Sequence, residues 1–99
     1  MAIEFTNDNS YLYWIANHPE GYVLNMRKNK SPGYMVLHKA TCYSITNLNR
    51  KAGAKEGGFT EHDYLKVGAE NVGDLRAWTR SNGRPDGSFS NECSFCKPT

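Results

Sequence analysis

The chain has 99 residues, of which 38% are hydrophobic and 12% aromatic, and its twelve basic and ten acidic side chains leave a formal charge of +2. This length predicts a single domain over residues 1–99, and the aromatic content argues against disorder because bulky side chains can form a core. The charge is too small to indicate nucleic-acid binding by itself, and no apolar run is long enough to cross a membrane. The first residues lack the basic start and apolar core of a signal peptide, so we expect a cytoplasmic protein.

The first predicted element is a helix over residues 11–18. Asn9 or Ser10 can serve as its N-cap, because their short polar side chains accept hydrogen bonds from free backbone N–H groups. Pro19 ends this helix, since proline disfavours helical backbone at the residue before it. Residues 10–30 are therefore expected to contain an N-terminal helix followed by the first strand of a hairpin.

Two segments rich in β-forming residues, 22–26 and 34–38, predict adjacent strands. Residues 27–33 between them contain asparagine, proline and glycine, which favour a turn. The two strands are therefore expected to pair as an antiparallel hairpin.

The second half of the chain predicts a loop, a strand and a helix. Residues 49–58 are polar, basic and glycine-rich, as is typical of an exposed loop, and residues 63–69 predict a third strand. Asn71 predicts the N-cap of a second helix, which Gly83 ends. Three apolar residues at helical spacing predict the buried side of this helix: Val72, Leu75 and Trp78. The expected fold is α+β, with a small three-stranded antiparallel sheet and two helices.

Two close pairs of metal-binding residues stand far apart in the sequence, His38-x-x-x-Cys42 and Cys93-x-x-Cys96. Two such pairs around a long insert are typical of a tetrahedral structural zinc site, because each pair forms a small chelate loop. Three cysteines cannot all form disulfides within one chain. The sequence therefore predicts one zinc ion held by three cysteines and one histidine, which stabilises the fold.

Other interpretations of these residues remain open. A C-x-x-C pair can be a redox pair, although such a pair usually begins a helix in a βαβ unit. Cys42 can be a buried free thiol, and His62 can replace His38 as the fourth ligand. The ligand types and their spacing favour zinc over these alternatives.

The order of these elements resembles the zinc domain of Ada-type DNA methylphosphotriester repair proteins and similar nuclease-associated zinc modules. The shared order is an aromatic strand, a ligand-x-x-x-Cys pair, a strand and a helix, and then Cys-x-x-Cys-Lys-Pro. The resemblance covers residues 34–99 and rests on seven residues: Tyr34, His38, Cys42, Cys93, Cys96, Lys97 and Pro98. It implies a zinc-stapled fold that binds the DNA backbone. In that family the first ligand is the cysteine that accepts the methyl group. Here that position is His38, whose imidazole lacks a nucleophilic sulfur, so methyl transfer is not expected.

Basic residues occur in two loops, in one turn and between two predicted zinc ligands. If these segments meet on one side of the molecule, they form a patch that can neutralise phosphates. The candidate nucleic-acid-binding residues are Arg27, Lys28, Lys30, Lys39, Arg50, Lys51 and Lys55. A second candidate stripe recurs at four-residue spacing: Arg76, Arg80 and Arg84. Taken alone, each group is more typical of a solvated loop or an exposed helix face.

These patterns predict a non-catalytic zinc module that binds DNA, including modified or damaged DNA. The alternative is a zinc-stabilised protein–protein interaction module, which an exposed apolar patch would indicate. An enzyme is not expected, because the sequence contains no paired carboxylates, no nucleophile beside a base and no phosphate-binding glycine loop. Neither a membrane nor a small-molecule substrate is indicated.

Overall fold

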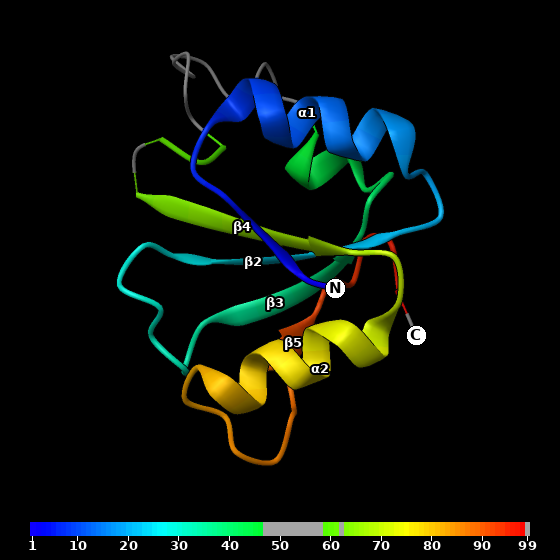
Figure 1. Cartoon of the computed structure of the whole chain (residues 1–99). Helices are drawn as coiled ribbons and strands as arrows, with labels where there is room; N and C mark the ends of the chain where they lie inside the picture. The colour runs from blue at the N-terminus through cyan, green and yellow to red at the C-terminus, as the bar shows by residue number, and fades with distance from the viewer. Residues whose placement is uncertain (47–58, 62, 99) are drawn as a thin grey trace.

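The computed structural model describes residues 1–46, 59–61 and 63–98 (Figure 1). The predicted loop at 49–58 and the alternative ligand His62 lie outside these ranges. Within these ranges, five strands, two α-helices and one short 3₁₀ turn follow one another. They are β1 (Ile3–Phe5), α1 (Asp8–Asn17), β2 (Tyr22–Arg27), β3 (Met35–Lys39), the 3₁₀ turn η1 (Tyr43–Ile45), β4 (Tyr64–Ala69), α2 (Val72–Ser81) and β5 (Asn91–Glu92).

The sheet is larger than predicted. The α+β class and the two helices are confirmed, but the prediction of a three-stranded antiparallel sheet was wrong, because the sheet is five-stranded and mixed, in the order β1-β4-β2-β3-β5. The predicted strands β2, β3 and β4 form its antiparallel centre. At the edges, β1 pairs antiparallel with β4 and β5 pairs parallel with β3. These edge strands span three and two residues, too few to produce a hydrophobic alternation that sequence reasoning can detect.

The two helices cover opposite faces of this sheet (Figure 1). Because side chains alternate along a strand, β2 directs Val23 into the core beneath α1, and Leu24 and Met26 into the core beneath α2. The result is a three-layer molecule with two separate cores. The predicted metal ligands Cys42 and Cys93 belong to the core on the α1 side.

Helix caps explain where both helices begin. The predicted caps Asn9 and Ser10 lie inside α1, since the cap is Asn7, whose Oδ1 accepts a hydrogen bond of 3.0 Å from the Ser10 N–H. Asn71 caps α2 as predicted, and its Oδ1 accepts a 2.8 Å bond from the Asp74 N–H.

Each helix has ten residues, half the length that crossing a bilayer requires, so within the described ranges neither can span a membrane.

Candidate metal centre

The structure brings the four predicted ligand residues to one place. The imidazole nitrogen and the three sulfur atoms of His38, Cys42, Cys93 and Cys96 all lie within 4.8 Å of one another. His38 comes from β3, Cys42 follows that strand, and Cys93 and Cys96 follow β5, which pairs with β3. The parallel pairing of the two strands therefore joins the two halves of the site.

Backbone hydrogen bonds fix the turns that carry the cysteines. The Cys93 N–H donates to the Leu37 carbonyl at 2.9 Å, which places this cysteine beside β3. The Lys97 N–H donates to the Cys93 carbonyl at 3.0 Å and closes the C-x-x-C turn. The Lys39 N–H points to the Cys96 sulfur at 3.3 Å, a contact that stabilises negative charge on a thiolate. The ligands are thus held by local structure on both strands.

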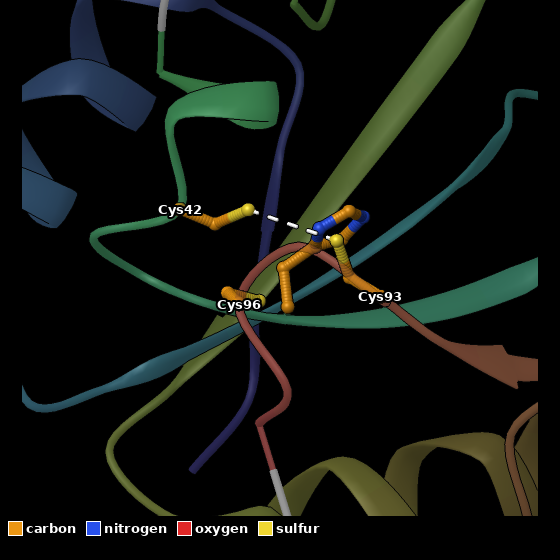
Figure 2. A group of neighbouring side chains, drawn as sticks. Cys42, Cys93 and Cys96 are labelled. Carbon is orange, nitrogen blue, oxygen red and sulfur yellow. Dashed lines mark hydrogen bonds between the residues drawn. The ribbon is translucent and has the colours of Figure 1, made fainter.

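The sulfur spacing fits a tetrahedral ion. The sulfur atoms of Cys42 and Cys93 point toward each other at 3.8 Å, as Figure 2 shows, and all three cysteines are free. A disulfide would require about 2.05 Å. Two thiolates bound to one tetrahedral zinc ion at about 2.3 Å lie about 3.8 Å apart. The cluster is therefore compatible with a shared metal ion, and its cysteines are not joined by a disulfide.

His38 is prepared to act as a neutral ligand. Its side chain is buried, and this burial, together with the positive charge of Lys66, lowers the pKa of His38 from 6.5 to about 4. At neutral pH the imidazole therefore carries no extra proton, and one ring nitrogen has a free lone pair. A metal can bind that nitrogen without first displacing a proton.

Burial and neighbouring groups shift the pKa values of two of the thiols in opposite directions. Burial opposes ionisation of Cys93, but hydrogen bonds from the Cys96 and Phe95 N–H groups and contacts with Cys42 and Ser44 outweigh it and lower the pKa of Cys93. Burial and the neighbouring thiols raise the pKa of Cys96 to about 11. A cation among these sulfurs would favour the thiolate of each cysteine, because opposite charge stabilises the ionised form. The cluster is therefore compatible with a bound cation.

Ser44 is a member of the site that sequence reasoning missed. The turn η1 places its Oγ 2.9 Å from the Cys42 sulfur, 3.4 Å from the His38 Nδ1 and 3.9 Å from the Cys93 sulfur. A hydroxyl in this position can donate a hydrogen bond to a thiolate ligand and orient it. Its position two residues after Cys42 was the only signal in the sequence, and serine is too common in turns for that signal to be specific.

No family model, no curated protein and no solved structure matches this chain. The resemblance to Ada-type zinc domains therefore stays a prediction.

The described members of the predicted basic patch do not all lie together. Lys39 pairs with Tyr22 at the start of β2, whereas Arg27 ends that strand and pairs with Tyr64. At about 3.4 Å per residue, the two ends of β2 are about 17 Å apart. Arg27 and Lys28 are exposed at one end of the sheet, and Lys39 is exposed at the other, beside the metal-ligand cluster.

Several other basic side chains are engaged within the molecule. The Lys30 ammonium lies 3.0 Å from a Glu4 carboxylate oxygen and 5.8 Å from the centre of the Trp78 ring. The guanidinium of Arg84 donates to the carbonyls of Pro32, Ser88 and Phe89. Arg76 donates to the Gly87 carbonyl at 3.3 Å. Arg76 and Arg84 therefore fix the loop that follows the helix, so the predicted stripe of three free arginines is not formed. Arg50, Lys51 and Lys55 lie outside the described residues.

Proposed function

We propose that this chain is a zinc-stabilised module that binds DNA and performs no chemistry at its metal. The observation that carries the metal assignment is the convergence of one imidazole nitrogen and three sulfurs within 4.8 Å of one another. Thiolates and imidazoles are the ligands that zinc prefers in structural sites, whereas magnesium and calcium prefer oxygen.

The number of ligands supports a structural role. His38, Cys42, Cys93 and Cys96 supply four donor atoms, enough to complete a tetrahedron without a bound water. Catalytic zinc sites keep one position open for water or substrate. A zinc ion in this cluster would stabilise the fold and leave no site for Lewis-acid chemistry.

Zinc is expected to stabilise mainly the edge of the sheet formed by the short strand β5. The strand β5 pairs with β3 through only two residues, Asn91 and Glu92. So short a strand adds few ladder bonds and needs another constraint. Bonds from one ion to Cys93 and Cys96 on one side and to His38 and Cys42 on the other would supply it.

DNA binding is supported by exposed cations and by the resemblance described above. Arg27, Lys28 and Lys39 are exposed on the described surface. Phosphate contacts by such residues supply most of the sequence-independent affinity of DNA-binding proteins. This affinity is expected to fall steeply as salt concentration rises.

Two measurements test the proposal. Purified protein should contain one zinc ion per chain, and Cys93→Ser should lower this content, whereas Ser94→Ala in the same turn should not. Mobility shifts on plain duplex, modified duplex and single-stranded DNA should show binding at low salt, which Lys28→Glu weakens. If none of the three DNAs is shifted at low salt, the DNA-binding part of the proposal is wrong.

A protein partner is the second candidate, favoured by Phe95. This side chain is 65% exposed on the turn between two metal ligands, where a bound ion would hold it rigidly. Recovery of one specific protein from nuclease-treated extract, lost in Phe95→Ser, would favour this function over DNA binding.

A further inference from the structure

One arginine on the α1 side of the sheet lies against two aromatic rings that also contact each other. The Arg27 guanidinium carbon lies 5.5 Å from the centre of the Tyr34 ring and 5.4 Å from that of the Tyr64 ring. The two ring centres are 6.2 Å apart, with an angle of 47° between the ring planes. We name these three residues the tyrosine–arginine surface.

We propose that the tyrosine–arginine surface binds a single-stranded segment of DNA, with a backbone phosphate at Arg27 and a base stacked against the tyrosine rings. This inference rests on the proposed DNA-binding function and goes beyond it, because it names the surface and the form of DNA. The metal-ligand cluster contributes to it only by stabilising the fold.

The sheet register places the three residues side by side. Arg27 on β2 pairs with Tyr64 on β4. Tyr34 directly precedes β3, whose first residue Met35 pairs with Met26, so Tyr34 comes next to Arg27 on the other side. Side chains at directly opposed positions of neighbouring strands lie on the same face. Three adjacent strands thus contribute to one surface cluster of two tyrosine rings and a guanidinium.

Arg27 is available to an anion, unlike Arg76 and Arg84, whose guanidinium groups donate to backbone carbonyls. Its side chain is exposed, and within the described ranges no carboxylate lies within ion-pair distance of it. The rings restrict the guanidinium without using its hydrogen-bond donors, since a cation–π contact involves the ring face. A positioned guanidinium binds phosphate through two parallel hydrogen bonds and loses less conformational entropy than a free one.

A second cation, Lys66, lies beside one of these rings, that of Tyr64. The Lys66 ammonium is 5.5 Å from the centre of the Tyr64 ring, and it donates hydrogen bonds to Asn25 Oδ1 at 2.8 Å and to the Phe59 carbonyl at 2.9 Å. Lys66 is buried, so it acts on a ligand through its charge and not by contact. The nearby Asp8 carboxylate offsets this charge, so Arg27 is the cation that a phosphate would contact.

The aromatic rings favour a single strand over a duplex. Tyr34 and Tyr64 are each partly exposed at the sheet surface. Bases can stack on such rings only when they are not already stacked within a double helix, and sheets carrying aromatic residues and cations are common platforms for single strands.

The test is fluorescence anisotropy of a labelled oligothymidine with the zinc-loaded protein over a range of salt concentrations. Arg27→Gln should weaken binding about tenfold and reduce the slope of log affinity against log salt by about 0.7, the value for one phosphate contact on a single strand. Tyr34→Leu should weaken binding about fivefold to tenfold and leave that slope unchanged, because it removes stacking and no charge.

Two matched variants control for nonspecific effects. Arg80→Gln removes an exposed arginine from α2, on the other face of the sheet, and Tyr13→Leu removes a tyrosine that is 74% exposed on α1. Neither should change affinity. Each variant that is compared must match the wild-type protein in circular dichroism and zinc content. If Tyr34→Leu fails to fold, the result for Arg27→Gln, at an exposed position, decides the test.

The outcomes separate this inference from the function on which it rests. If wild-type protein binds no DNA of any form, the proposed function itself fails. If wild-type protein binds the single strand but Arg27→Gln behaves like Arg80→Gln, DNA binding stands and the tyrosine–arginine surface is wrong. Binding to duplex alone would likewise overturn the assignment of a single strand.

Discussion

Between the sheet and α2 the core is a cluster of aliphatic and methionine side chains, whereas between the sheet and α1 it combines aromatic rings with charged groups and the metal-ligand cluster. The α2-side core consists of Leu24, Met26, Met35, Leu37, Leu65, Val67, Ala69 and Leu75. On the α1 side the buried residues include Asp8, Lys66 and His38. One sheet is therefore stabilised in two different ways.

The charged groups on the α1 side are satisfied by specific partners. The Asp8 carboxylate accepts hydrogen bonds of 2.7 Å from both the N–H and the hydroxyl of Thr60. Lys66 donates to Asn25 and Phe59. Buried charges destabilise a fold when such partners are lost. Stability on the α1 side is therefore expected to depend on metal and on pH, whereas the α2-side core should depend on neither.

Metal removal should produce the largest difference in stability between the two sides of the sheet. Chelation of zinc, or Cys93→Ser, is expected to lower the free energy of unfolding by more than about 4 kcal/mol, because the binding energy of a structural zinc is also folding energy. Native-state hydrogen exchange should show β5 and the cysteine turns losing protection before β4 and α2. Equal loss of protection in all elements would contradict the independence of the two cores.

A cavity in the α2-side core should lower the free energy of unfolding without changing zinc binding. Leu24 is fully buried there, so Leu24→Ala should cost about 2–5 kcal/mol in denaturant unfolding. The zinc content per folded chain should stay unchanged, since this side chain points away from the ligands. Loss of zinc from folded Leu24→Ala protein would show that the two cores are coupled.

The smallest expected effect is a pH dependence that comes from Lys66. Burial lowers its pKa from 10.5 to about 8, although the charge of Asp8 acts in the opposite direction. Between about pH 8 and pH 10.5 the unfolded chain binds more protons at this residue, so stability should rise with pH in that window. From pH 7 to pH 9.5 the wild-type protein should gain about 2 kcal/mol relative to Lys66→Met.

The measurement is urea unfolding of both proteins at each pH, with the exposed Lys28→Met as control. That control should follow the wild-type curve, because the Lys28 side chain is exposed. A constant difference between the wild-type protein and Lys66→Met across the whole range would contradict the assigned pKa.

Sequence reasoning found the features that have local signals. The cap Asn71 and the central strands are defined by neighbouring residues, and the four candidate ligands by residue type and spacing. The strand β5 was missed because Asn91 and Glu92 are polar and are in a strand only through their pairing with β3. No periodicity marks such a pairing, which depends on tertiary contacts.

The buried charges and the separation of the cations were also invisible in the sequence. An alternating strand would place Lys66 on a solvent-facing side, yet helix α1 and Phe59 cover that face, so the lysine is buried. Arg27 and Lys39 both adjoin the hairpin in sequence, but the register places them at opposite ends of β2. Charge patterns along a chain do not reveal which residues share a surface until the strand order is known.

The most direct test of the account is zinc K-edge X-ray absorption on the purified protein. One zinc ion per chain should show three sulfur neighbours at about 2.3 Å and one nitrogen at about 2.0 Å, with no oxygen neighbour. His38→Ala should remove the nitrogen neighbour and leave the three sulfur neighbours in place. A stably folded chain without bound metal, or a zinc ion with fewer than three sulfur neighbours, would contradict the central claim.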